Sequence, residues 1–132
     1  MPFPPKPRRQ TRLFLSLFLL WTTGLAGCGT SPPSDRSNMM DQVLGALQVQ
    51  GAAKRDAALA EACRQSADAG DGFAVMQGLP LIQQESLRNQ VAVECAEALS
   101  GCGKQNEAID AANLITKEEQ REELVNRLEA GT

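Results

Sequence analysis

The chain has 132 residues, enough for one small domain, with 13 Lys and Arg against 16 Asp and Glu and a formal net charge of −3. His and Tyr are absent, which excludes Ser-His-Asp and Cys-His catalytic sets and metal sites that contain His. The charge is uneven along the chain. All 16 acidic residues lie after residue 27, together with only nine basic residues that form no patch, which argues against nucleic acid as a partner.

Residues 1–27 have the layout of a signal peptide. A basic segment over residues 1–12 precedes an apolar run over residues 13–21, which is shorter than the about 20 residues that a membrane-spanning helix needs. The Arg8-Arg9 pair leaves twin-arginine export open as an alternative, although Gln10-Thr11 lacks the apolar continuation expected there. We therefore leave residues 1–27 out of the predicted fold.

The end of this segment, Leu25-Ala26-Gly27-Cys28, resembles the lipobox of bacterial lipoproteins at all four positions. The resemblance implies cleavage before Cys28, a diacylglycerol thioether on the Cys28 thiol, and acylation of the new amino terminus. An ordinary secretory signal with a nearby Cys is the alternative. Position 29 is Gly and not the Asp that resembles an inner-membrane retention signal in some diderm bacteria, so the expected location in a diderm is the outer membrane.

Residues 28–37 are expected to be the lipidated Cys and a flexible tether. Residues 29–37 contain no apolar side chain that could enter a core, and the Pro32-Pro33 pair favours extended backbone. At roughly 3 Å per residue, such a tether would hold the folded part up to about 30 Å from the bilayer.

Residues 38–132 are predicted to form one all-α domain that repeats itself. Arg55, Arg88 and Arg121 are spaced evenly, with a period of 33 residues, and the apolar residues between them fall at helical spacing. Gly70 and Gly103 stand where a helix C-terminus needs a left-handed residue. The predicted helices cover residues 38–49, 52–69, 72–79, 84–101, 105–114 and 117–130, with Pro80 ending the third.

Short connections force consecutive helices to pack antiparallel. A helical hairpin repeated about two and a half times then gives a short right-handed α-solenoid, with a bundle of unrelated helices as the alternative. Thr116-Lys117-Glu118-Glu119 fits a capping box for the last helix.

The segment Gly103-Lys104-Gln105-Asn106-Glu107-Ala108-Ile109 resembles the G-x-x-x-E-A-[IL] turn of the tetratricopeptide-like (TPR-like) superfamily. The resemblance covers about residues 52–130. It implies an α-solenoid of antiparallel hairpins whose concave face binds peptides or other helices.

After Cys28 the chain keeps three thiols, Cys63, Cys95 and Cys102, in a compartment that usually permits disulfides. Cys63 and Cys95 lie on neighbouring long helices and are the better candidates for a disulfide. The alternatives are three small buried apolar residues or a reactive thiol, although no His is present to deprotonate such a thiol.

These patterns predict a lipid-anchored, non-catalytic adaptor that binds another protein of the cell envelope. No cofactor, metal or nucleic acid is expected. The largest apolar cluster, Phe73, Met76 and Leu79, is the candidate interaction face. The alternative is a structural component of the envelope that associates with itself end to end.

Overall fold

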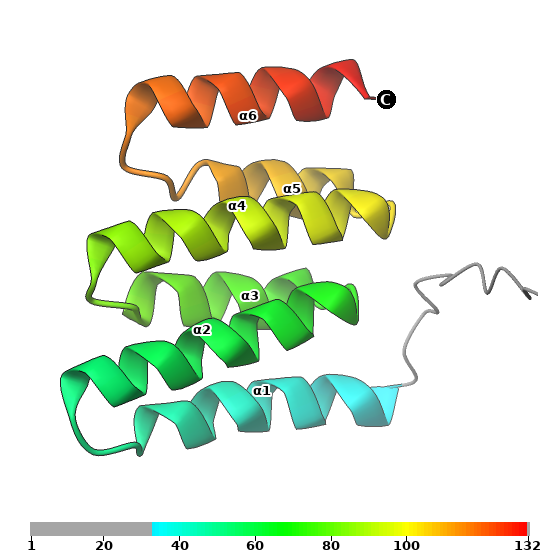
Figure 1. Ribbon diagram of the computed structural model, residues 1–132. Helices are drawn as coiled ribbons and strands as arrows, with labels where there is room; N and C mark the ends of the chain where they lie inside the picture. The colour runs from blue at the N-terminus through cyan, green and yellow to red at the C-terminus, as the bar shows by residue number, and fades with distance from the viewer. Residues whose placement is uncertain (1–32, 132) are drawn as a thin grey trace, which may run out of the picture.

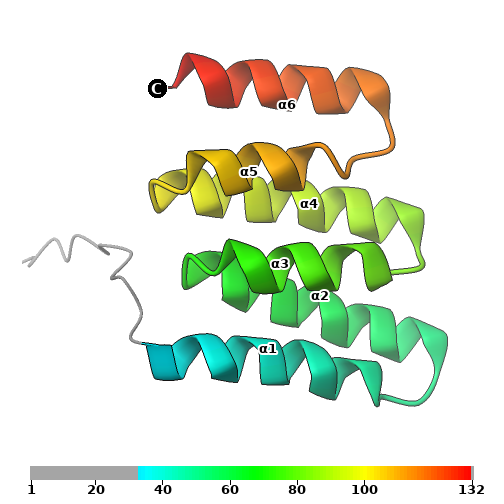
Figure 2. The same cartoon turned by 180° about the vertical axis from the view of Figure 1, so that it is seen from behind.

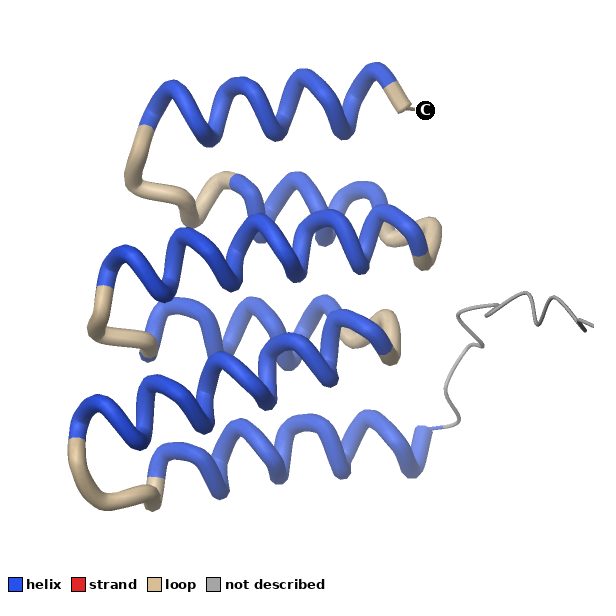
Figure 3. Tube along the Cα trace, viewed as in Figure 1, coloured by secondary structure: helices blue, strands red, loops and turns tan. Residues whose placement is uncertain are grey.

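The structure is a computed structural model that describes residues 33–131. The described part of the chain is all-helical and contains no strand (Figure 3). Its elements are α1 (Pro33–Leu47), α2 (Ala52–Asp68), α3 (Gly72–Gly78), the 3₁₀ turn η1 (Leu79–Leu81), α4 (Glu85–Gly101), α5 (Gln105–Ala112) and α6 (Glu118–Ala130). The predicted all-α class is therefore confirmed for these residues.

The helices stack one after another, and each runs opposite to the one before it (Figure 1). Seen from behind, α1, α3 and α5 lie in front of α2 and α4, so the stack has two sides (Figure 2). The α6 helix closes the end of the stack remote from α1. Residues distant in sequence thus meet only when they belong to helices that are close in chain order.

The helix boundaries repeat at a fixed interval. The long helices α2, α4 and α6 begin at residues 52, 85 and 118, and the short helices α3 and α5 begin at residues 72 and 105. Both α2 and α4 have 17 residues. Each of these starts therefore follows its equivalent by 33 residues.

Two glycines end the long helices as predicted. Gly70 and Gly103 adopt positive φ angles of 72° and 73°, which a residue with a Cβ rarely does. The amide of Asp71 donates to the Ser66 carbonyl at 2.8 Å, and the amide of Lys104 donates to the Leu99 carbonyl at 2.9 Å. These bonds satisfy carbonyls that a helix end would otherwise leave open, and they turn the chain sharply into the short helices.

The first helix begins earlier than predicted. It starts at Pro33, so residues 33–37, which we expected to belong to the tether, are helical. Proline is well suited to the first helical turn because its fixed φ matches the helix and its missing N–H would have had no partner there. The chain between Cys28 and the first helix is correspondingly short.

The core is built from small and aliphatic side chains and contains no aromatic ring among the described residues. Each of the six helices contributes at least one buried apolar residue. The largest fully buried side chains are Leu59, Leu79, Ile82, Leu99 and Ile115. Many of the remaining core positions are Ala, which lets neighbouring helices approach closely.

Candidate protein-interaction surface

The predicted interaction face of Phe73, Met76 and Leu79 is only partly present. Phe73, in the first turn of α3, is 68% exposed. Met76 is half-buried against the core, and Leu79 is completely buried. The prediction was wrong for Leu79 because the chain turns into η1 at this residue and directs its side chain inward.

Cys63 and Cys95 are free, buried thiols, so the disulfide that we considered between them is not formed. Burial raises the pKa of the Cys63 thiol to about 12 and raises that of the Cys95 thiol further, with the neighbouring Cys63 adding to the rise. Since disulfide formation needs a thiolate, both thiols are poorly placed to react. For this pair the alternative of small buried apolar residues is the correct one.

The other two cysteines have different settings. Cys102, at the C-terminus of α4, is half-buried and disulfide-bonded, so the interpretation as a small buried apolar residue does not hold for it. Its sulfur lies 3.8 Å from the carbonyl oxygens of Ala67 and Asp68 at the end of α2. Cys28, the predicted site of lipidation, lies outside the described residues.

Buried polar side chains fix the loops that begin the long helices. The Asp56 carboxylate accepts hydrogen bonds from the amides of Gln83 and Gln84, at 3.2 and 2.8 Å. Thirty-three residues later, Asn89 accepts from the amide of Thr116 at 3.1 Å. Each of the two side chains thus ties its own helix to the start of the next long helix, and sequence analysis missed both.

Thr116 does not cap the last helix as predicted. The first residue before α6 is Lys117, and it makes no side-chain cap. The Thr116 hydroxyl instead donates to Glu85 at 2.6 Å and accepts from the Asn89 amide at 2.9 Å. The capping-box prediction was wrong because these partners from α4 compete for the hydroxyl.

Two arginines, also 33 residues apart, make the same contact. Arg88 donates to the carbonyl of Ile82 at 3.4 Å, and Arg121 donates to the carbonyl of Ile115 at 3.3 Å. Both isoleucines are buried. The arginines that marked the period in the sequence therefore hold the loops that precede the long helices.

Two ion pairs join the long helices on their exposed side. Arg64 on α2 donates to Glu94 on α4 at 2.6 Å, and Arg127 on α6 donates to Glu97 on α4 at 2.6 Å. The hydrogen bond between Arg64 and Glu94 raises the pKa of the Arg64 guanidinium and lowers that of the Glu94 carboxyl. Both pairs are partly exposed, so each stabilises the fold by no more than about 1 kcal/mol.

Three hollows follow the long helices. One of about 380 Å³ involves α1 and α2, one of about 160 Å³ lies between α2 and α4, and one of about 300 Å³ lies beside α4 and α6. The last is lined by side chains that can donate and accept hydrogen bonds around a single apolar residue: Ser86, Asn89, Gln90, Val93, Glu94, Lys117 and Gln120. Such a surface suits a polypeptide better than a small apolar ligand.

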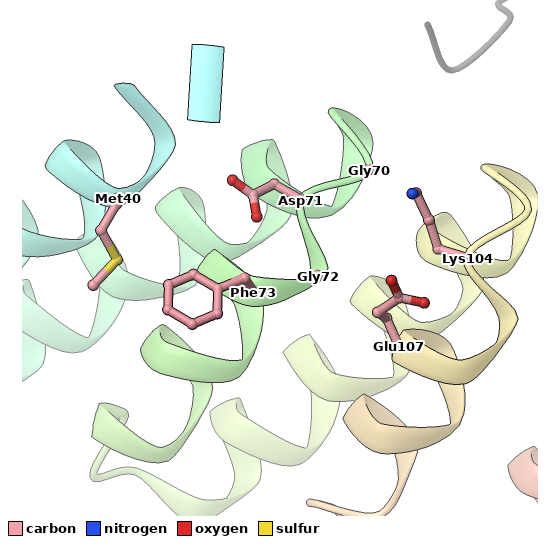
Figure 4. Close-up of a pocket in the computed structure, with 7 residues that line it drawn as sticks. All are labelled: Met40, Gly70, Asp71, Gly72, Phe73, Lys104 and Glu107. Carbon is pink, nitrogen blue, oxygen red and sulfur yellow. The ribbon is translucent and has the colours of Figure 1, made fainter. Parts of the chain in front are cut away.

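A fourth hollow, of about 350 Å³, lies on the other side of the stack at the start of α3. Figure 4 shows Met40 and Phe73 on one side of Gly72, and Lys104 and Glu107 on the other. A Cβ on Gly72 would come within 2.6 Å of Glu107, so the glycine is what lets α3 and α5 pack this closely. Asp71 caps α3 by accepting from the amide of Ala74 at 3.1 Å.

Residues 33–131 contain no group of three or more His, Cys, Asp or Glu side chains placed to hold a metal ion. Within the same range, no helix combines the length and the apolar character needed to cross a membrane. No protein-family model, no curated protein and no solved structure matches the chain.

Proposed function

We propose that this protein is a bacterial lipoprotein, anchored through Cys28, whose TPR-like helical repeats act as a non-catalytic adaptor for another envelope protein. The lipobox resemblance at Leu25-Ala26-Gly27-Cys28 supports the anchor. The 33-residue spacing of the helix starts, and of the contacts made by Asp56 and Asn89, supports a repeat. Stacked antiparallel hairpins of this kind form a short α-solenoid.

The observation that carries the adaptor role is the row of hollows along the long helices. These hollows lie beside successive helices, and the side chains around them are mostly amides, hydroxyls and charged groups. An extended polypeptide carries hydrogen-bonding groups at every residue and could follow such a row. We therefore place the partner on the side of the long helices and not on the predicted face around Leu79.

Two exposed residues of α6 provide a matched test of this surface. Gln120 lines the hollow beside α4, whereas Asn126 is exposed on the same helix and does not line it. Gln120→Arg should abolish co-purification of the partner from mild detergent, and Asn126→Arg should leave it intact. Equal recovery of the partner with both variants would contradict the proposed surface.

Intact mass of the membrane-extracted protein tests the anchor. The proposal requires a mature chain that starts at Cys28 and carries diacylglycerol, and a Cys28→Ser control that carries no lipid. A thiol forms either a thioether or a disulfide. A mature chain without lipid, with Cys28 cleaved elsewhere or bridged to Cys102, would therefore contradict the lipoprotein assignment.

Self-association is the second candidate, favoured by the exposed Leu44 and Leu47 on the first helix of the stack. An end that is not polar can pack against another copy. Sedimentation over a range of concentrations separates the two roles. A monomer at all concentrations supports the adaptor, and a concentration-dependent oligomer supports the structural component.

A further inference from the structure

The large apolar side chains that stay exposed are confined to one end of the described stack. They are Leu44 and Leu47 on α1, Phe73 on α3 and Leu81 in η1, with exposed fractions of 47, 37, 68 and 41%. None belongs to α4, α5 or α6. The end of the stack that is nearest the predicted lipid anchor in sequence is therefore the apolar end.

Four of the side chains at this end form what we call the α1–Phe73 patch: Met40, Leu44, Leu47 and Phe73. The three residues on α1 are spaced by four and three, which places them on one face of the helix. Phe73 lines the same hollow as Met40, and the two point into one region in Figure 4. The patch thus spans α1 and the first turn of α3.

Charge is distributed in the opposite sense along the stack. The α6 helix contains five acidic residues and two arginines, whereas Asp41 is the single charged residue between residues 38 and 47 of α1. Next to the patch, Lys104 and Glu107 lie across Gly72 from Phe73 and oppose each other in sign. The apolar end is therefore the end with the least electrostatic barrier to an anionic bilayer.

The length of chain before α1 limits how far this end can lie from the anchor. Five residues separate Cys28 from Pro33, and even fully extended they span no more than about 18 Å. Met40 lies seven residues into α1, which adds about 10 Å along the helix axis. A chain anchored at Cys28 therefore keeps the patch next to the bilayer at a high effective concentration.

We propose that the α1–Phe73 patch rests on the lipid bilayer, with Phe73 and Met40 entering the interface between headgroups and acyl chains. This inference rests on the lipid anchor of the proposed function. Apolar side chains on an amphipathic surface enter a bilayer to a depth of roughly 5–10 Å. The patch has four residues, far fewer than the about 20 to 30 per partner of a stable protein interface, so a bilayer fits it better than a second copy.

The sequence offers a clean probe for this contact. Trp21 is the only Trp and belongs to the signal peptide, so the mature chain would have none. Phe73→Trp and Leu44→Trp place one reporter in the patch at exposed positions, and Asn126→Trp places one on the exposed side of α6 as the control. Each full-length variant is purified as the lipoprotein and reconstituted into vesicles of phosphatidylethanolamine and phosphatidylglycerol that contain brominated phosphatidylcholine.

The expected result is about a twofold or greater loss of emission by lipid bromine at positions 73 and 44, with emission shifted to shorter wavelength, and little change at position 126. Vesicle flotation, measured on the same samples, reports the anchor separately. Protein that floats without quenching at position 73 overturns the patch and leaves the anchor standing. A blue shift without lipid quenching identifies a protein neighbour and also overturns it. Protein that neither floats nor carries lipid overturns both proposals.

Discussion

At the scale of single residues, Gly78 marks the closest approach between α3 and α2. A Cβ built on this residue would lie 2.5 Å from the Cys63 sulfur and 3.5 Å from Val43. Its φ is −83°, so the backbone itself would accept another residue. The glycine is needed for the space it leaves and not for its conformational freedom.

Gly78→Ala should therefore lower the free energy of unfolding, by about 1–3 kcal/mol, because the added methyl overpacks the contact with Cys63. Urea denaturation followed by far-ultraviolet circular dichroism measures the change. Removing the sulfur as well, in Gly78→Ala with Cys63→Ala, should recover part of the loss.

Gly101→Ala is the control for this experiment. Gly101 is helical, and nothing lies within 4 Å of its Cβ position, so the substitution should leave stability unchanged or raise it by up to about 1 kcal/mol. Equal destabilisation by the two substitutions would show that the contact with Cys63 is not what makes Gly78 necessary.

Sequence analysis was least informative about which way individual side chains point. The apolar spacing of Phe73, Met76 and Leu79 follows a helix, but α3 ends at Gly78, and the turn of η1 buries Leu79 while Phe73 stays exposed. The Thr116 hydroxyl was assigned to a local cap, yet Glu85 and Asn89 bind it from another helix. Both errors have the same cause, since tertiary partners override a local pattern.

At the scale of elements, Asp56 and Asn89 join one hairpin to the next. Asp56 uses both carboxylate oxygens to accept from two successive backbone amides, whereas Asn89 has one carbonyl oxygen and accepts from one. Both side chains are buried. Buried polar groups of this kind cost stability when a partner is removed.

Asp56→Ala should cost about 1–3 kcal/mol of unfolding free energy, since the amides of Gln83 and Gln84 lose their acceptors. Asp56→Asn should cost less because one acceptor is retained, as it is at Asn89. Urea denaturation of both variants, with the exposed Glu61→Ala as a control, measures the difference. Equal losses for Ala and Asn would indicate that these hydrogen bonds contribute little.

The helices themselves were largely predictable. From α2 onward, every observed boundary lies within two residues of the predicted one, because Gly70, Gly103 and Pro80 end helices for local reasons. The first boundary was missed by five residues. Pro33 and the polar residues after it satisfied the criteria for a tether, and nothing local in the sequence distinguishes that from a first helical turn.

At the scale of the whole molecule, the two ends of the stack differ in how much they bury. The α6 helix has two buried residues, Leu124 and Leu128, whereas α4 has six and lies between neighbours. The side chain of Gln105 adds one hydrogen bond to the α6 backbone, at 2.6 Å from the Leu128 carbonyl. The C-terminal helix should therefore open separately from the rest.

Amide hydrogen exchange should show α6 exchanging through openings of lower free energy than those of α4. Leu124→Ala, which removes one of its two buried side chains, should cost about 2–4 kcal/mol and raise exchange most strongly within α6. Exchange at the same rate in α4 and α6, before and after the substitution, would mean that the stack opens only as a unit.

The aromatic-free core has a consequence for how this protein can be observed. Phe73 is the single aromatic residue between positions 28 and 132, and 68% of it faces outward. The mature chain would therefore absorb almost nothing at 280 nm, and its tertiary packing would give almost no near-ultraviolet dichroism. Loss of side-chain packing with the helices kept would go unnoticed by optical methods, so methyl resonances of the buried Leu, Ile and Val are the signals by which a native core can be told from a loosened one.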